Sequence, residues 1–237
     1  MVIPSGLIEV DSEKALSINE NLPIRISQRA VDTIIYYEVG GKDYYNRYLK
    51  TPTVPAWRTT ASGVTIMFGN DVGHMTHSEI QKAFEGVLSQ KQIDLLKSVS
   101  GLKGKSAYYN GLPKVKNLIS VEYNDAEKVF KQYTLPKFTQ QTASAFGLSK
   151  TRLHPHSNGA LTSLVFNRGP SLSNTDSRKE MRWIKNNISL KKDDKVPSDI
   201  RSMKRLWSPT KLKGLHLRRD AEAKLFQEGL DLRAETK

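Results

Sequence analysis

The carboxyl group of Glu38 is the side chain in this sequence best placed for acid–base chemistry. A stripe of apolar residues at helical spacing runs through residues 30–35, and Glu38 continues that stripe just before Gly40-Gly41. At this position a carboxylate is expected to be partly desolvated and close to the negative end of the helix dipole, and both effects raise its pKa. A carboxylic acid that stays protonated near neutral pH can donate a proton to a leaving oxygen. The alternative is a glutamate that turns outward at a frayed helix end.

Aromatic residues gather along the chain on both sides of Glu38. They are Tyr36, Tyr37, Tyr44, Tyr45, Tyr48 and Trp57. Rings beside a catalytic acid can stack on sugar rings and exclude water, so Tyr44, Tyr45 and Trp57 are candidate substrate-binding residues. We also expect some of these rings to cover a small β region.

Two histidine patterns offer rival chemistry. Asp71, His74 and His77 have a spacing that could hold a metal, but no cysteine or second histidine pair supports such a site. Loop capping is the favoured interpretation of these residues, so the sequence predicts no metal and no cofactor. His154 and His156 lie in a turn before a predicted helix, where capping or surface exposure is favoured over metal binding.

Composition excludes several classes of protein. The 237 residues contain no cysteine, which rules out disulfides, thiolate nucleophiles and cysteine-ligated metal sites. No G-x-x-x-x-G-K-[ST], G-x-G-x-x-G or G-x-S-x-G stretch is present, so neither nucleotide binding nor a serine hydrolase is indicated. Hydrophobic residues make up 38% of the chain, which is enough for a substantial core. No window approaches the ~20 apolar residues of a membrane span. The N-terminus lacks the basic start and apolar run of a signal peptide.

The elements that must position Glu38 are one helix, a β-rich excursion and then a series of helices. Glycine and proline punctuate residues 40–73, where Val64–Phe68 is a strand candidate. A capping box, Thr76-x-x-Glu79, starts the helical part. Helices are expected over about 77–88, 90–99, 105–118, 124–146 with a kink at Pro136, 157–168, 176–187, 198–206 and 216–229. The prediction is an α+β fold, predominantly helical with a small β-rich excursion after the first helix. Residues 1–24 are interpreted as a leader or linker segment and residues 25–237 as one domain.

Three segments resemble, in the same order, the phage-lysozyme and pesticin-like muramidases. In the first, Glu38 precedes Ser62-Gly63-Val-Thr-Ile-Met-Phe-Gly-Asn-Asp71-Val-Gly73, which is similar to the family pattern S-G-V-T-I-G-x-G-Y-D-x-G. The second, Gly159–Gly169, looks like the family's A-L-x-S-x-x-F-N-x-G helix. The third, Arg218–Gly229, is similar to its terminal R-R-x-x-E-x-x-L-F-x-x-G helix. Together the matches span about residues 27–230.

The resemblance implies a lysozyme-like fold and hydrolysis of the β-1,4 bond between N-acetylmuramic acid and N-acetylglucosamine in peptidoglycan. Glu38 would be the general acid of this reaction. A second residue would position water or stabilise the developing positive charge, and this role is open among Thr65, Ser62 and Asp71, ranked in that order. The aspartate that phage lysozymes usually place nine residues after the glutamate is missing, because that position is Arg47.

Further details of the resemblance concern the loop and the second segment. Asp71 lies in a Gly-x-Asp-x-Gly turn, so a bond from its side chain to the loop backbone explains this residue equally well. Met67 and Asn70 depart from the family, in which Gly and Tyr or His are usual. The second segment contributes Asn167 and Arg168 as candidate substrate-binding residues.

Net charge suggests a different function. The chain carries 37 Lys and Arg against 24 Asp and Glu, and the excess of +13 is concentrated in its C-terminal third. The basic residues there include Lys191, Lys192, Lys195, Arg201, Lys204, Arg205, Lys211, Lys213, Arg218 and Arg219. Such a field attracts polyanions, although a solvated basic surface is the simpler interpretation. The alternative to an enzyme is a non-catalytic basic domain that binds anionic cell-wall polymer or nucleic acid, or an inactive lysozyme-like fold kept for wall binding. Glu38 favours the enzyme, since a binding domain has no use for a carboxylate at that position.

A muramidase of this kind is expected to act in the bacterial periplasm or cell wall. Without a signal peptide, it would be delivered by a secretion system, as part of a larger chain, or by lysis. An antibacterial effector, a bacteriocin toxin domain or a phage endolysin fits these routes, and the pesticin-like motif favours the first two. The expected partners are peptidoglycan and an immunity protein that covers the cleft. We expect a monomer with no specific nucleic-acid partner and no membrane span.

Overall fold

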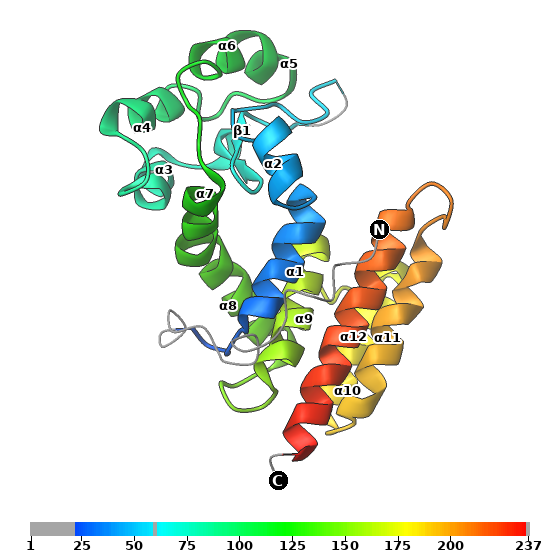
Figure 1. The fold of residues 1–237 in the computed structure, drawn as a ribbon. Helices are drawn as coiled ribbons and strands as arrows, with labels where there is room; N and C mark the ends of the chain where they lie inside the picture. Colours follow the sequence, from blue (N-terminus) through cyan, green and yellow to red (C-terminus); the bar gives the residue numbers. More distant parts are fainter. Residues whose placement is uncertain (1–21, 59–60, 236–237) are drawn as a thin grey trace. The chain divides into compact units, whose positions relative to one another are not determined.

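The computed structural model describes residues 22–58 and 61–235. Most of these residues are helical, and one two-stranded antiparallel sheet lies in the first third of the chain (Figure 1). The predicted α+β class, mainly helical with a small β element, is therefore confirmed. The predicted leader over residues 1–24 lies mainly outside the described residues. At its end, Leu22 and Ile24 are buried.

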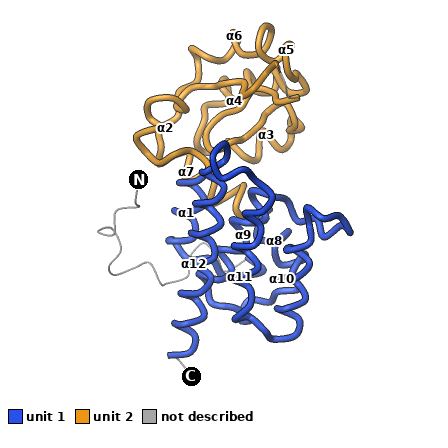
Figure 2. The backbone as a smooth tube through the Cα atoms, turned by 90° about the vertical axis from the view of Figure 1, so that its right-hand side faces the viewer, with its two compact units in different colours: residues 1–37, 136–237 blue, residues 38–135 orange. Residues whose placement is uncertain are grey.

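The described chain divides into two compact units, which Figure 2 draws in different colours. Unit 1 comprises the described parts of residues 1–37 and 136–237, and unit 2 comprises residues 38–135. The chain passes between them inside helix α1 (Gln28–Val39) and again at the start of helix α8 (Leu135–Phe146). The predicted domain over residues 25–237 thus contains two units, and Glu38 is the first residue of unit 2.

Unit 1 is built around helix α9 (Pro155–Arg168), in which every residue from His156 to Val165 is buried. Burial of the whole circumference explains why the sequence of α9 has no amphipathic stripe. Helix α12 packs along α9 and α11, and α10 packs on α11 (Figure 1). The remaining helices of the unit are α10 (Lys179–Ser189), α11 (Val196–Ser202) and α12 (Lys213–Glu235), with short 3-10 turns η5 (Asp176–Arg178), η6 (Asp193–Lys195) and η7 (Met203–Leu206).

A close approach between α1 and α9 depends on Gly159. A Cβ built on Gly159 would lie 2.0 Å from the Cβ of Ala30 and 3.4 Å from its Cα. Carbon atoms do not approach to 2.0 Å in a packed core, so the two helices can lie this close only with glycine at position 159. This packing gives a structural reason for the glycine that begins the second family-like segment.

We expect Gly159→Ala to lower the free energy of unfolding by about 1–3 kcal/mol, because the new methyl group forces α1 and α9 apart. Urea unfolding followed by circular dichroism measures the change. Adding Ala30→Gly removes the opposing methyl group and should restore part of the loss. A double variant no more stable than Gly159→Ala alone would contradict this account of the packing.

A cluster of buried charges joins α12 to α9. Arg218, Arg219 and Glu222 are 3%, 0% and 0% exposed. Glu222 Oε1 accepts hydrogen bonds from Arg218 Nε at 3.2 Å, from Arg219 Nη2 at 2.9 Å and from Ser163 Oγ at 2.6 Å. The expectation that Arg218 and Arg219 form part of a solvent-facing basic surface is therefore wrong. Their spacing of four and three residues from Glu222 places all three groups on one helix face.

Unit 2 packs short helices around the small sheet. The sheet pairs β1 (Thr65–Ile66) with β2 (Asn70–Asp71). Three aromatic rings fill the core beside it, with ring centroids of Tyr45 and Phe68 5.2 Å apart and those of Tyr45 and Tyr123 5.6 Å apart. The helices are α2 (Lys42–Tyr48), α3 (His77–Phe84), α4 (Gln90–Lys97), α5 (Gly104–Ser106), α6 (Leu112–Val115) and α7 (Tyr123–Val129), with the short turn η2 (Val72–His74) and the π turns η3 (Ala107–Gly111) and η4 (Phe130–Thr134).

Residues 40–73 contain less β structure than the sequence predicts. Helix α2 occupies the start of this segment, and each strand has only two residues. Tyr45 anchors α2, because its ring is fully buried and its hydroxyl donates a hydrogen bond to Val121 O at 3.1 Å. A seven-residue helix is unstable alone, so tertiary packing that the local sequence does not reveal holds it.

The helix start predicted at Thr76 is confirmed. Capping boxes join Thr76 to Glu79 at the start of α3 and Ser89 to Gln92 at the start of α4. At Pro136, where a kink is predicted, the helical run has the π turn η4 directly before it. Because a proline ring collides with the carbonyl four residues earlier, a wider turn lets the helix continue.

Candidate active site

Glu38 lies in the last turn of α1, against the sheet of unit 2. Gly40 and Gly41 follow it with φ of 70° and 89°, a conformation that favours glycine and ends the helix. A Cβ built on Gly69 would lie 3.5 Å from Glu38 Oε1, so the carboxylate lies beside the turn between β1 and β2. Glu38 as a whole residue is exposed to solvent. The acid is therefore accessible and adjacent to the hairpin.

Asp71 has a structural role in the loop. Its carboxylate accepts hydrogen bonds from Gly63 N at 3.0 and 3.1 Å and from Gly73 N at 3.0 Å. The two glycines touch, since a Cβ on Gly63 would lie 2.4 Å from the Cα of Gly73. The aspartate of the Gly-x-Asp-x-Gly pattern thus closes the loop through hydrogen bonds from its backbone, as predicted for a residue of this turn.

Thr65 and Ser62 lie on either side of Gly63 in the same loop. Thr65 pairs with Asp71 across the sheet and is half-buried. Its hydroxyl donates to Gly63 O at 3.3 Å, at the long end of the hydrogen-bond range. Ser62 is also half-buried, and its carbonyl accepts from Gly104 N at 2.8 Å. The structure therefore brings Ser62, Thr65 and Asp71 together, with Glu38 at the turn end of the same hairpin.

The three aromatic candidates have different environments. Tyr45 is a core residue, and burial raises the pKa of its hydroxyl, so it is not a substrate-binding residue. Tyr44 is 51% exposed, and its ring centroid lies 4.7 Å from that of Tyr48. Trp57 is half-buried and stacks on Tyr108 with ring centroids 4.3 Å apart. Only Tyr44 and Trp57 thus keep a surface that a ligand could contact.

Two further residues of unit 2 were missed by the sequence analysis. Tyr108 stacks on Trp57, and Tyr109, which is 60% exposed, meets the edge of both rings at 5.3 and 5.1 Å. The feature of the sequence that could have identified these two residues is that they are adjacent tyrosines directly before Asn110-Gly111. The three rings form an aromatic group on the surface of unit 2.

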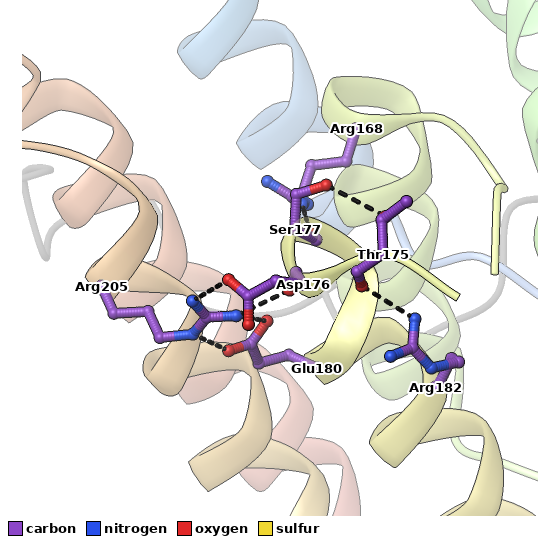
Figure 3. A network of polar contacts seen from close by, with 7 residues as sticks. All are labelled: Arg168, Thr175, Asp176, Ser177, Glu180, Arg182 and Arg205. Carbon is purple, nitrogen blue, oxygen red and sulfur yellow. Dashed lines mark hydrogen bonds and ion pairs between the residues drawn. The ribbon is translucent and has the colours of Figure 1, made fainter. Parts of the chain in front are cut away.

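Asn167 and Arg168 belong to unit 1, at the C-terminal end of α9. Asn167 is exposed, and its Oδ1 accepts from Arg219 Nη2 at 3.1 Å. Arg168 donates to the backbone carbonyl of Ser177 (Figure 3), and its guanidinium lies 5.1 Å from the ring centre of Trp207. Burial lowers the pKa of Arg168 to about 10, and the nearby arginines add to this effect. Both side chains therefore hold the end of α9 and the loop after it.

The predicted basic surface of the C-terminal third is partly neutralised. Arg205 pairs with Asp176 at 2.6 Å and with the buried carboxylate of Glu180 (Figure 3). Nearby, Arg182 donates to the carbonyl of Thr175 at 3.0 Å. Lys204 forms an ion pair with Asp220. These pairs fasten 3-10 turns to helices, so the net charge of the sequence overstates the field available to a polyanion.

The rival metal pattern does not form a site. His74 Nε2 lies 3.0 Å from Ala61 O and 3.8 Å from Asp71 Oδ2. His77 lies in the first turn of α3 and is exposed. Within residues 22–58 and 61–235, no three His, Cys, Asp or Glu side chains are grouped to hold a metal.

The histidine pair before α9 has a structural role. His154 caps α9, accepting a hydrogen bond from His156 N at 3.2 Å, as predicted. His156 is buried, against the expectation of capping or exposure, and its Nδ1 lies 2.8 Å from Ser27 Oγ. Burial, with smaller contributions from the charges of His154 and Arg29, lowers the pKa of His156 to about 4. The ring is therefore neutral in the folded protein at neutral pH.

This burial makes stability depend on pH. Unfolded histidine titrates near 6.5, so between about pH 4 and 6.5 the unfolded chain binds the additional proton. Stability should fall as pH is lowered through this window, by about 3 kcal/mol in total. Denaturant midpoints measured from pH 7 to pH 4 should show a smaller fall for His156→Gln than for the wild type. His77→Gln is the exposed control, and equal pH profiles for the wild type and His156→Gln would refute the assignment.

None of the helices in the described part of the chain has the length and hydrophobicity to cross a membrane. No family model matches the chain, and no curated protein matches it.

Proposed function

We propose that this protein is a lysozyme-like muramidase, a glycoside hydrolase that cleaves the β-1,4 bond between N-acetylmuramic acid and N-acetylglucosamine in peptidoglycan. The observation that carries the proposal is the position of Glu38. Its accessible carboxylate ends the first helix and lies beside the turn of a small β hairpin, whose Ser62–Gly73 loop is closed by Asp71. This is the order of acid, hairpin and loop that the family-like motifs imply.

Glu38 acts as the general acid in this proposal. A glycan strand bound over Glu38 and the hairpin of unit 2 displaces water from the carboxylate, and desolvation favours the protonated form. The proton passes to the glycosidic oxygen as the bond to C1 breaks. The hydroxyl of Thr65 or Ser62 orients the water that attacks C1, this water loses its proton to the solvent, and Glu38 is reprotonated from the solvent. Tyr44 and the Trp57 group supply aromatic surface for sugar rings.

Inversion at C1 is the expected stereochemical outcome. A retaining enzyme needs a second carboxylate as nucleophile, and the nearby candidate, Asp71, is already bound to two backbone N–H groups. Cleavage of the β bond should therefore release the α-anomer first, which proton NMR of the initial product detects. Initial release of the β-anomer would contradict inversion. It would indicate a covalent intermediate formed by a nucleophile other than Asp71.

The proposed activity is tested by release of soluble fragments from purified, dye-labelled sacculi. The wild-type protein should release dye from sacculi and leave dye-labelled chitin, which lacks muramic acid, largely intact. Absence of release under conditions in which a control lysozyme is active would contradict the proposal. It would turn attention to binding of an anionic wall polymer.

The proposed setting is the bacterial periplasm or cell wall. An antibacterial effector or bacteriocin domain, or an endolysin, reaches this compartment through a secretion system, a larger chain or lysis. A producing cell that is itself exposed to such an enzyme needs an immunity protein that covers Glu38.

A further inference from the structure

The aromatic group of Trp57, Tyr108 and Tyr109 has a well-supported outer ring. The rings of Trp57 and Tyr108 are nearly parallel, with an interplanar angle of 14°. The ring of Tyr109 is steeply inclined to both, at 77° and 89°, and its centre lies at almost the same distance from each, 5.3 and 5.1 Å. Tyr109 therefore lies beside the stacked pair and is supported by both rings, while it stays 60% exposed. An aromatic side chain held in this way can contact a ligand with little loss of conformational entropy.

Backbone hydrogen bonds anchor both arms of the aromatic group to the candidate catalytic loop. Thr53, four residues before the indole, pairs with Thr65 through two backbone hydrogen bonds of 2.9 and 2.8 Å. Gly104, four residues before the first of the two tyrosines, donates from its backbone N to Ser62 O at 2.8 Å. Four residues span at most about 14 Å of extended chain and about 6 Å of helix. The aromatic group therefore lies near Ser62 and Thr65, the residues proposed to orient water.

Two exposed cations flank the aromatic group. The guanidinium of Arg58 lies 4.8 Å from the ring centre of Trp57. Lys105 precedes the two tyrosines by three and four residues in a continuous helical run, so it lies on the same face of that run. Neither cation forms an ion pair with a carboxylate of the described residues, and the segments that contain them, residues 44–70 and 95–121, have no Asp or Glu. A stacking surface is thus combined with two cations that an anion can reach.

We propose that the aromatic group, together with Arg58 and Lys105, is a subsite that holds a peptidoglycan strand and recognises the carboxylates of its muramyl peptides. Sugar rings stack on Tyr109, and the carboxylates pair with the two cations. Chitin has a similar sugar backbone without these carboxylates, so the subsite favours peptidoglycan over chitin. The inference deepens the proposed function and rests on it for the identity of the polymer.

Isothermal titration calorimetry with two soluble oligomers tests this subsite. One is a peptidoglycan oligomer that carries its stem peptides, and the other is a neutral chito-oligosaccharide of the same length. The full chain is used with Glu38→Gln, so that binding is measured without hydrolysis. We expect saturable binding of both, with the peptidoglycan oligomer bound about three- to tenfold more tightly, the effect of one or two exposed ion pairs.

Replacing both cations separates their role from that of the net charge. Arg58→Gln/Lys105→Gln should bind the two oligomers with equal affinity. Lys82→Gln/Lys91→Gln removes the same charge from exposed positions of α3 and α4, and this control should keep the preference for peptidoglycan. Equal loss of the preference in both double variants would indicate a diffuse basic field and would overturn the proposal.

The stacking surface is tested by Tyr109→Ala, which should weaken binding of both oligomers about tenfold, as for an aromatic anchor of an interface. Leu118→Ala, which truncates another exposed apolar side chain of unit 2, is the control and should leave both affinities unchanged. Unchanged affinities in Tyr109→Ala, or no binding of either oligomer, would overturn the proposal. Failure of the proposed function gives a different result, in which the oligomers bind but the wild-type protein releases no fragments from sacculi.

Discussion

Replacing Glu38 with glutamine should reduce the rate of sacculus hydrolysis about 10²–10⁴-fold, the usual contribution of a general acid. The substitution keeps the size and polarity of the side chain but removes its dissociable proton. Because Glu38 is exposed at the end of α1, the variant should fold with almost unchanged stability. The measurement is the initial rate of dye release at equal concentrations of folded protein.

The matched control for this prediction is Glu85→Gln. Glu85 is an exposed glutamate at the end of another helix of unit 2, α3. This variant should release dye at the wild-type rate. If Glu38→Gln hydrolysed sacculi as fast as Glu85→Gln, Glu38 would not be the acid.

A large loss of stability is expected on substitution of Glu222, whose single carboxylate forms ion pairs with two buried arginines. Glu222→Gln removes the negative charge between Arg218 and Arg219, and an unpaired buried charge is strongly destabilising. The free energy of unfolding should fall by about 3–5 kcal/mol. Since domains are stable by about 5–15 kcal/mol in total, this loss is a large fraction of the stability of the folded protein.

Chemical denaturation of Glu222→Gln beside Asp231→Asn measures this cost. Asp231 is an exposed carboxylate on the same helix that accepts a surface hydrogen bond from Gln227, so removal of its charge should be nearly neutral. Similar midpoints for the two variants would mean that the buried cluster contributes little. The R-R-x-x-E pattern of the third family-like segment would then lack the structural explanation given above.

Local signals made much of the helical framework predictable. Residues close together in the sequence indicate the apolar stripe of α1, the two capping boxes at Thr76 and Ser89, and the turn that contains Asp71. The capping boxes and the bond from Gly73 N to Asp71 form within a few residues of the signal, and the stripe shows in the spacing of the apolar residues, so sequence patterns alone locate these features. The short helix α2 could not be predicted in this way, because burial of Tyr45 against distant Val121 stabilises it.

The candidate site was harder to predict than the fold. Sequence spacing placed Glu38 on the buried stripe, but the helix ends at the next residue, Val39, and Glu38 is an exposed residue. Charge counting placed Arg218 and Arg219 on the surface, whereas the ion pairs with Glu222 allow both to be buried. The aromatic group of Trp57, Tyr108 and Tyr109 joins residues about fifty positions apart, and no local pattern reports such a contact.

The central claim is tested most directly by the chemical identity of the ends that the protein creates in peptidoglycan. Purified sacculi are digested, the new reducing ends are reduced with borohydride, and the fragments are analysed by mass spectrometry. Reduced N-acetylmuramic acid ends are expected with the wild-type protein and should be nearly absent with Glu38→Gln. Reduced N-acetylglucosamine ends, anhydro ends or free peptides would contradict the central claim, because each identifies cleavage of a different bond or by a different mechanism.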